Sequence, residues 1–365
     1  MSIAKSIQIG RIFMTNIKSA MKAVVLEKPC NAEELKITEV CIPKVKPEWI
    51  LIKLKAFGIN RAEIFTRNGY SPSVKLPRII GIECVGIVED PSDSHFKKGD
   101  VVFSMMNGMG RDFDGSYAEY TLVPINQVYK IDYNSFFSSS NEDTNIYNDN
   151  FHNIKNPEAL KWAKIGAYPE LYYTAYGSLF KSLKLKSGEI ILIRGGTGSV
   201  ALAAIQIAKA INTTVIVTTR DKSKESFLKE NGADIVLVED NFFEENLWKA
   251  FPSGVDKVLE LIGAPTLKSS LKITCKGGIV CMTGCLGGWV IDSFEPLVDI
   301  ISESYLTTFD STFINKKIIE EMFYFITKKN IEPHISEIFT FDKISEAHKY
   351  LESNKANGKI VVVTE

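Results

Sequence analysis

The hydrophobic pattern divides the chain into a β-rich first part and a later part in which strands alternate with helices. In the first part, short apolar runs are bounded by Gly and Pro, which is typical of strands joined by tight turns. The predicted strands of this part are residues 21–26, 49–57, 83–89, 100–104 and 115–124. We therefore expect a β-rich N-terminal domain.

From about Lys161 onward, short aliphatic runs alternate with longer amphipathic segments. The predicted strands are residues 190–194, 214–218, 235–238, 256–260 and 279–283, and the predicted helices are residues 199–211, 223–231, 242–250 and 266–274. A helix over residues 343–354 and a strand over residues 359–364 follow near the C-terminus. This alternation predicts a parallel sheet wrapped by helices.

Two segments depart from these patterns. Residues 1–20 contain Lys5, Arg11 and Lys18 but no acidic residue, which fits either a mitochondrial targeting segment or a plain N-terminal extension. Residues 134–156 are dominated by Asn, Ser and Asp and lack helical or strand periodicity. We expect this second segment to be an exposed, mobile insertion.

The most informative local motif is Gly195-x-x-Gly198-x-x-Ala201, which lies between a predicted strand and a predicted helix. Strand, glycine turn and helix form the context of a dinucleotide site, in which backbone approaches the pyrophosphate at a helix N-terminus. The alternative is a glycine turn that serves only helix packing. The residues expected to bind the cofactor here are Gly195, Gly196, Thr197, Gly198, Ser199 and Val200.

The end of the next strand bears on which cofactor is bound. NAD sites usually place Asp or Glu there for the ribose hydroxyls, whereas this chain has Arg220, with Lys224 shortly after it. A cation suits the 2′-phosphate of NADPH, so we predict NADPH as the cofactor. Asp221 is adjacent and keeps NADH open as an alternative.

Composition and charge exclude several classes of protein. The 365 residues favour two domains, and 45% hydrophobic against 24% charged residues excludes disorder of the whole chain. The net charge of -1 provides no field for nucleic acid, and no apolar run approaches the ~20 residues that span a bilayer. Six Cys without a Cys-x-x-Cys motif argue against a disulfide framework and favour a reducing compartment. A cytoplasmic location is predicted.

Several ordered blocks of the sequence resemble the medium-chain dehydrogenase/reductases. They are residues 56–63 (AFGINRAE), 81–86 (GIECVG), 98–102 (KGDVV), 115–120 (GSYAEY), 169–176 (PELYYTAY), the glycine turn and residues 261–263 (LIG). The resemblance implies an α/β fold: a doubly wound Rossmann parallel sheet plus a β-rich GroES-like N-terminal domain. It implies an extension over residues 1–20, a GroES-like catalytic domain over 21–175, a Rossmann domain over 176–325 and a return segment over 326–365.

The zinc ligands of this superfamily are replaced in this chain. Zinc-containing alcohol dehydrogenases carry Cys at the position of Asn60, His at the position of Ile82 and a second Cys near the position of Glu170, while Glu83 remains. A carboxylate alone does not make a Cys/His-type zinc site, and the four-cysteine structural lobe is missing as well. The chain is therefore similar to the zinc-independent quinone oxidoreductase branch, related to zeta-crystallin, and no metal is expected.

The expected activity follows from that resemblance. Without a metal to polarise an alcohol or carbonyl oxygen, hydride transfer remains feasible to an electron-poor acceptor such as a quinone. We expect this chemistry in a dry cleft between the two domains. One alternative is an enoyl thioester or enone reductase, and another is a non-catalytic protein that senses NADPH or binds nucleic acid. The resemblance also implies a homodimer through edge strands of the Rossmann sheet.

Further site residues are predicted from the resemblance. Asn60 and Thr174 are expected near the nicotinamide, although a turn and helix packing would also explain them. Tyr70 is a candidate proton donor, but it stands ten residues after Asn60 whereas the Tyr of related enoyl thioester reductases stands eleven after its Asn; solvent is the competing donor. The remaining candidates for cofactor contact are Gly263, Gly284 and Lys359, of which Lys359 is expected at the cofactor phosphates. Glycines that serve turns alone and a solvated lysine are the alternatives.

Overall fold

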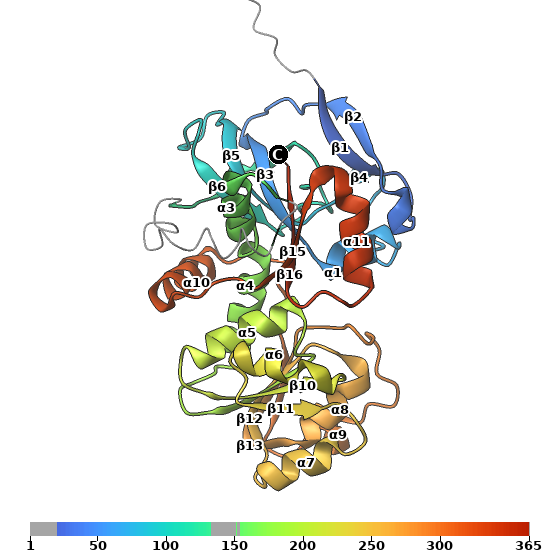
Figure 1. Ribbon diagram of the computed structural model, residues 1–365, viewed down its shortest axis with the longest axis vertical. Helices are drawn as coiled ribbons and strands as arrows, with labels where there is room; N and C mark the ends of the chain where they lie inside the picture. The colour runs from blue at the N-terminus through green and yellow to red at the C-terminus, as the bar shows by residue number, and fades with distance from the viewer. Residues whose placement is uncertain (1–19, 133–150, 152–153, 365) are drawn as a thin grey trace, which may run out of the picture.

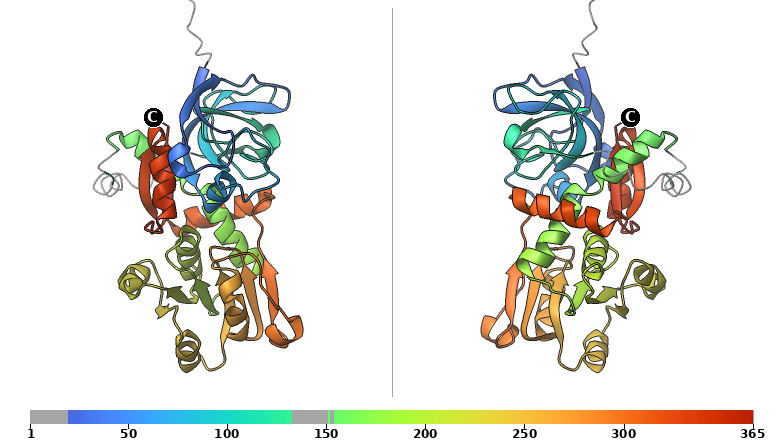
Figure 2. Two further views of the ribbon diagram at one scale, coloured as in Figure 1. Left: turned by 90° about the vertical axis from the view of Figure 1, so that its right-hand side faces the viewer. Right: turned by 90° about the vertical axis from the view of Figure 1, so that its left-hand side faces the viewer.

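The computed structural model describes residues 20–132, 151 and 154–364 (Figure 1). The expectations for the N-terminal extension before residue 20 and for most of the insertion at 134–156 lie outside the described residues. Two bodies, each built on a β-sheet, lie one above the other, with α4 (Pro169–Tyr176) running between them (Figures 1 and 2).

One body is built on a six-stranded sheet whose described strand pairs are all parallel. Its strands are β9 (Ile190–Arg194), β10 (Thr214–Thr219), β11 (Ile235–Val238), β12 (Val255–Glu260), β13 (Thr274–Met282) and β14 (Tyr305–Thr308). Their order is β11-β10-β9-β12-β13-β14, so the order reverses between β9 and β12. In doubly wound sheets, ligands bind outside the carboxyl ends of the strands at this reversal. The predicted parallel sheet is confirmed.

Helices cover both faces of this sheet because its strands alternate between two apolar faces. Ile191 and Ile193 belong to a core shared with α5, whereas Leu192 belongs to a core shared with α7 and α8. The helices of this body are α5 (Ser199–Lys209), α6 (Glu225–Glu230), α7 (Phe243–Ala250), α8 (Ala264–Lys272) and α9 (Pro296–Asp299), with the short 3-10 helix η4 (Lys222–Lys224) before α6.

The other body contains a seven-stranded sheet that combines N-terminal and C-terminal strands. Its order is β15-β16-β3-β5-β6-β8, and β7 also pairs with β3. These strands are β3 (Trp49–Ile59), β5 (Glu83–Asp90), β6 (Val101–Met105), β7 (Tyr120–Pro124), β8 (Tyr129–Lys130), β15 (Ile335–Thr340) and β16 (Lys359–Val363). A separate sheet has the order β2-β1-β4, formed by Ile37–Cys41, Ala20–Leu26 and Arg78–Ile79. The expected β-rich GroES-like part is confirmed.

The C-terminal return places the last strand between β15 and β3 of this seven-stranded sheet. β16 is antiparallel to β3, with Ile360 opposite Ile59 and Val361 opposite Gly58. Figure 1 shows the red C-terminal strands among the blue N-terminal ones. Residues at the start of β16 and the end of β3 are therefore neighbours despite their separation in sequence.

The remaining helices surround this sheet and join it to the parallel one. They are α1 (Arg61–Arg67), α3 (Pro157–Gly166), α4, the π-helix η3 (Gly177–Ser182), α10 (Lys316–Lys329) and α11 (Ile344–Glu352), with 3-10 helices η1 (Ala32–Glu34), η2 (Ile125–Gln127) and η5 (Phe341–Lys343). α4 continues directly into η3, which reaches β14 of the parallel sheet. Across the described part of the chain, no helix combines the length and apolarity needed to cross a membrane.

Candidate functional site

A buried ammonium lies where β16 and β3 meet. Lys359 Nζ is 2.6 Å from Glu83 Oε1 and 2.6 Å from Asn60 Oδ1. Lys359 and Glu83 are almost completely buried, and Asn60 is half-buried. A charge so deeply buried is tolerated because it is paired and hydrogen-bonded. Burial alone would lower the pKa of Lys359, but the surrounding carboxyls outweigh it and raise that pKa, so the ammonium remains charged.

Gly58 provides the space that this ion pair fills. A Cβ at Gly58 would lie 2.2 Å from Lys359 Cε and 2.3 Å from Glu83 Oε1, well inside van der Waals contact. The absence of a side chain at Gly58 is therefore a condition for placing Lys359 and Glu83 together.

Two further carboxyls border the pair. Glu63 Oε2 accepts the Asn60 backbone N–H at 3.0 Å and Glu63 Oε1 accepts that of Ile82 at 3.2 Å. Burial, together with the neighbouring Glu83, raises the pKa of Glu63 to about 7. Glu83 Oε2 accepts the backbone N–H of Glu170 at 3.0 Å, which fixes the first turn of α4 on the cluster.

We call Lys359, Glu83, Asn60, Glu63 and Glu170 the buried cluster. From it, α4 and η3 carry a stripe of polar side chains toward the parallel sheet. Glu170, Thr174 and Ser178 follow one another at intervals of four residues, so they lie on one helix face. Thr174 donates its hydroxyl to Glu170 Oε1 at 2.8 Å, and Ser178 donates to the Thr174 carbonyl at 2.7 Å. Because the Ser178 hydrogen is used there, Thr283 donates in its 2.8 Å hydrogen bond to Ser178 Oγ. The stripe thus connects Glu83 to the carboxyl end of β13.

The glycine turn after β9 has the shape that a dinucleotide requires. Gly195 has φ +84°, and a Cβ at Gly196 would lie 2.0 Å from Val217 Cγ1. Gly198 is the N-cap of α5 and has no side chain to bond the first N–H groups of that helix. The N-terminus of α5 can therefore bind a pyrophosphate, and Ser199 and Val200 follow at its first positions.

Buried charges hold the neighbouring strand ends in place. Arg194 forms an ion pair with Glu239 and donates to Ser270 Oγ at 3.0 Å. Glu260 Oε1 accepts the backbone N–H groups of Ile262 at 2.8 Å and Gly263 at 3.0 Å. Sequence reasoning missed these positioning residues, although charged residues at the ends of apolar strands were a signal for them.

Gly263 and Gly284 belong to close backbone contacts at the same edge of the sheet. Gly263 has φ +98°, and a Cβ there would lie 2.7 Å from the Gly288 carbonyl oxygen. A Cβ at Gly284 would lie 2.2 Å from the Leu261 carbonyl oxygen. Both glycines are thus explained by packing, and their contact with a cofactor stays a prediction.

The residues predicted to select the cofactor lie after β10. Arg220 is exposed directly after the strand, and Lys224 is half-buried at the end of η4. The carboxylate of Asp221 accepts the Ser223 N–H at 2.9 Å, and hydrogen bonds to Ser223 lower the pKa of Asp221. Asp221 therefore caps its own turn, and it remains exposed beside the exposed cations Arg220 and Lys222.

Two predicted residues are placed differently from expectation. The ammonium of Lys359 is buried against Glu83 and Asn60, which corrects the expectation that it reaches the cofactor phosphates. A buried ammonium with these partners has no surface to offer a phosphate. Tyr70 is 71% exposed on the turn after α1, and its hydroxyl joins none of the cluster's hydrogen bonds among the described residues. Thr174, by contrast, reaches Asn60 through Glu170 and Glu83.

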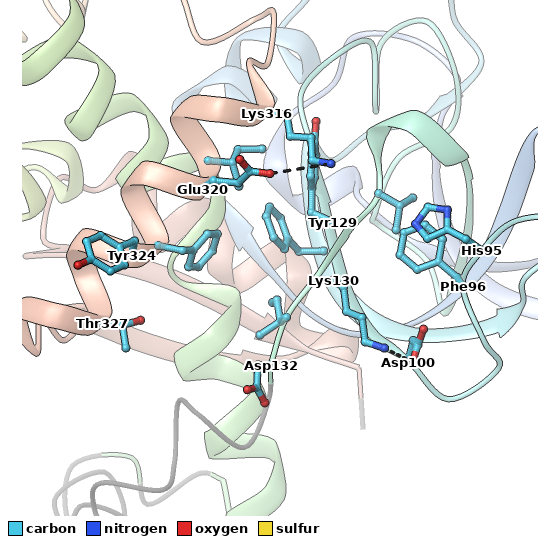
Figure 3. Close-up of a pocket in the computed structure, with 15 residues that line it drawn as sticks. His95, Phe96, Asp100, Tyr129, Lys130, Asp132, Lys316, Glu320, Tyr324 and Thr327 are labelled. Atoms are coloured by element: carbon cyan, nitrogen blue, oxygen red, sulfur yellow. Dashed lines mark hydrogen bonds and ion pairs between the residues drawn. The ribbon is translucent and has the colours of Figure 1, made fainter.

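A separate cavity lies between α10 and the β6 and β8 end of the seven-stranded sheet (Figure 3). Its volume is about 620 Å³, and β6, β8 and α10 line it. Lys130 forms an ion pair with Asp100 at 2.7 Å on its wall. None of the predicted site residues lines this cavity, so it is not the candidate active site.

Two family models match separate stretches of the chain. The one described as an alcohol dehydrogenase GroES-like domain matches residues 46–133. The one described as a zinc-binding dehydrogenase matches residues 231–362.

Curated relatives match over nearly the whole length. The quinone oxidoreductase of Rattus norvegicus is 28% identical over 362 residues, covering 96% of this chain and 100% of the relative. The acryloyl-coenzyme A reductase of Sulfurisphaera tokodaii is 26% identical over 366 residues, covering 94% of this chain and 99% of the relative.

Solved structures share the fold. The quinone oxidoreductase from Coxiella burnetii superposes with a TM-score of 0.76 at 23% identity, covering 95% of this chain and 100% of the other. A mycobacterial protein complexed with NADPH superposes with a TM-score of 0.75 at 24% identity, covering 94% of this chain and 100% of the other.

Proposed function

The chain is an enzyme of the medium-chain dehydrogenase/reductase family, and from this premise we propose that it reduces quinones or related activated carbonyl compounds with NADPH and without zinc. The observation that carries the proposal is the ion pair of Lys359 with Glu83 beside Asn60. The quinone oxidoreductase relative supports the substrate class.

The residues present do not fit a catalytic zinc ion. Zinc sites use Cys, His and carboxylate ligands, whereas Asn60 and Ile82 offer an amide and an alkyl group. The retained Glu83 already accepts from the Lys359 ammonium at 2.6 Å. A dication beside that ammonium would be repelled. In the part of the chain that the structure describes, no group of three or more His, Cys, Asp or Glu side chains is arranged to hold a metal ion.

The residues that suit NADPH are the glycine turn and the cations after β10. Backbone N–H groups at the start of α5 would hold the pyrophosphate, and Arg220 with Lys224 would bind the 2′-phosphate. When bound, NADPH supplies the hydride. The protein orients the reacting end with Thr174 and the amide of Asn60, whose position Lys359 and Glu83 fix.

A second candidate function is reduction of an enone or an enoyl thioester on the same scaffold. The acryloyl-coenzyme A reductase relative favours it, since that name denotes a conjugated thioester. If Tyr70 protonates the product, Tyr70→Phe depresses enone reduction strongly and leaves quinone turnover nearly intact. Equal loss with both acceptors would remove this distinction.

We also propose that the protein forms a homodimer through β14. This strand is at one end of the order of the parallel sheet, and Tyr305 on it is 61% exposed. Edge strands offer unpaired backbone groups to a second chain.

The test of the proposed function is oxidation of NADPH by an ortho-quinone, an enone and an enoyl thioester in parallel. We expect fastest turnover with the quinone and much slower turnover with NADH. Tight NADPH binding without turnover of any acceptor would instead support a protein that senses the cofactor.

A further inference from the structure

Glu170 differs from the other carboxyls of the buried cluster in its exposure. Glu83 is completely buried and Glu63 is 1% exposed, whereas 9% of Glu170 remains open. Its Oε1 accepts the Thr174 hydroxyl, while Oε2 enters none of the hydrogen bonds between described residues. Glu170 Oε2 is therefore the cluster's free carboxyl oxygen.

Buried carboxyls outnumber the cations around Glu170, which favours a proton on one of them. Glu83 faces it from β5, Lys359 from β16 and Arg111 from the loop after β6, while Thr174 bonds it from its own helix. Together with Glu63 there are three carboxyls against two cations, and Arg111 is only half-buried. Fully ionised, the buried group would carry uncompensated negative charge, which is costly.

The position of Glu170 on the helix adds a geometric reason. The stripe formed by Glu170, Thr174 and Ser178 ends at Thr283, beside the carboxyl ends of the parallel strands. A dinucleotide held at the glycine turn would place its reacting ring along these strand ends. Glu170 lies at the other end of the stripe, on the side of the ion pair.

From this geometry we propose that Glu170 is a catalytic acid, whose Oε2 delivers a proton to the substrate oxygen during the reduction. This inference rests on the proposed function, and it supplies a proton donor for the proposed reduction of quinones. Thr174 holds Oε1, which leaves Oε2 as the carboxyl oxygen that can carry and release the proton. Burial together with Glu83 raises the pKa of Glu170 despite Lys359, Arg111 and the Thr174 hydrogen bond, which favours the acid form.

The step balances in atoms and electrons. The hydride carries two electrons to the acceptor and leaves a negative charge on the substrate oxygen. The O–H bond at Glu170 Oε2 breaks, a new O–H bond forms on the substrate, and the carboxylate then takes a proton from water through its exposed edge. One NADPH and one proton are consumed for each acceptor reduced.

The first test replaces Glu170 by Gln, which keeps an acceptor for Thr174 but has no acidic proton. We expect kcat to fall about 10²-fold or more, as for loss of a general acid, with the affinity for NADPH unchanged. The wild-type rate should fall as pH rises through the pKa of Glu170, and this alkaline fall should be absent from the pH–rate profile of E170Q. E170D should restore the fall of the rate at high pH, with a lower kcat than the wild type.

The matched control is Glu346→Gln on α11, an exposed glutamate that is 3.8 Å from Lys343. It should leave kcat and the pH profile as in the wild type. An E170Q enzyme with wild-type kcat and an unchanged profile would overturn the inference while leaving the proposed function intact.

The second test does not depend on turnover. Infrared difference spectra compare the wild type with E170Q. The wild type should show the carbonyl stretch of a protonated carboxylic acid at pH values above those at which ordinary glutamates ionise. This band should be absent from E170Q. A wild-type band that vanishes at the pH values where ordinary glutamates ionise would overturn the acid role. A wild-type protein that reduces no acceptor at all would overturn the proposed function together with this inference.

Discussion

Asn60 is held by charges on both ends of its amide. Oδ1 accepts from Lys359, and Nδ2 donates to Glu83 Oε1 at 2.9 Å. The orientation of this amide is therefore set by the ion pair, and Lys359 acts on the proposed reaction through Asn60 as a positioning residue.

Removing the ammonium should destabilise the protein strongly. We predict that Lys359→Met lowers the free energy of unfolding by about 3–5 kcal/mol, because Glu83 is left buried without its cation. Urea denaturation would measure the change, and binding of NADPH should be retained because the Lys359 ammonium is buried against Glu83 and Asn60 and so has no surface for a phosphate. The control is Lys355→Met at an exposed site; equal stability of both variants would contradict the prediction.

His348 makes stability depend on pH through a second buried group. Arg67 Nη1 donates to its Nδ1 at 3.1 Å, so Nε2 carries the hydrogen and donates to Tyr117 Oη at 2.8 Å. Burial, together with the Arg67 charge, lowers the pKa of His348 from 6.5 to about 3. The unfolded chain then binds a proton between these values that the folded protein does not, so stability is complete above pH 6.5 and is lost as pH falls toward 3.

We predict that between pH 7 and pH 4 the wild type loses about 3 kcal/mol more stability than His348→Gln. Denaturation curves at both pH values give this difference directly. Parallel losses in the two proteins would show that His348 does not titrate on unfolding.

Residue types in the site could be predicted only where a short motif specifies them. The glycine turn was predicted because Gly195, Gly196 and Gly198 lie within one strand–turn–helix unit. The role of Lys359 was wrong because its partner Asn60 lies 299 positions away, and no local pattern reports that contact.

At the scale of elements, we expect the junction of β10 and η4 to decide between NADPH and NADH. We predict that Arg220→Ala weakens NADPH binding about 10- to 100-fold, the range for losing a charge-assisted contact, and leaves NADH binding unchanged. Fluorescence titration with both cofactors measures this, and Lys229→Ala on α6 is the control. Equal weakening of both cofactors would contradict the assignment of Arg220 to the 2′-phosphate.

Five of the six parallel strands were predicted because they contain aliphatic runs: the strand predicted at 190–194 coincides with β9. β14 was missed, because Tyr305–Thr308 holds only one aliphatic side chain. α10 was missed, although its buried residues Ile319, Met322 and Ile326 recur at helical spacing. β13 starts at Thr274 rather than at the predicted residue 279. Gly277 and Gly278 interrupt the apolar pattern of this strand, so its first half was not predicted.

At the scale of the whole molecule, the edge of the parallel sheet predicts the assembly state. We expect sedimentation to give about twice the chain mass of 40.8 kDa. Tyr305→Asp on β14 should shift the protein toward the monomer, because a buried carboxylate at the interface is costly. A monomeric wild type would contradict the dimer.

The division into a β-rich part and a parallel sheet was predicted because each has its own hydrophobic period. The position of β16 between β15 and β3 was not, because its pairing with β3 joins opposite ends of the chain. The buried cluster depends on that pairing, so its ion pair was beyond sequence reasoning too.

The central claim is that the ammonium of Lys359, and not a zinc ion, lies beside Glu83 and Asn60 in the active enzyme. The most direct measurement is NADPH oxidation by an ortho-quinone after exhaustive dialysis against a chelator, followed by stepwise addition of zinc. We predict full activity in the metal-free protein and no gain on adding zinc. Activity that disappears with the metal and returns in proportion to bound zinc would contradict the account.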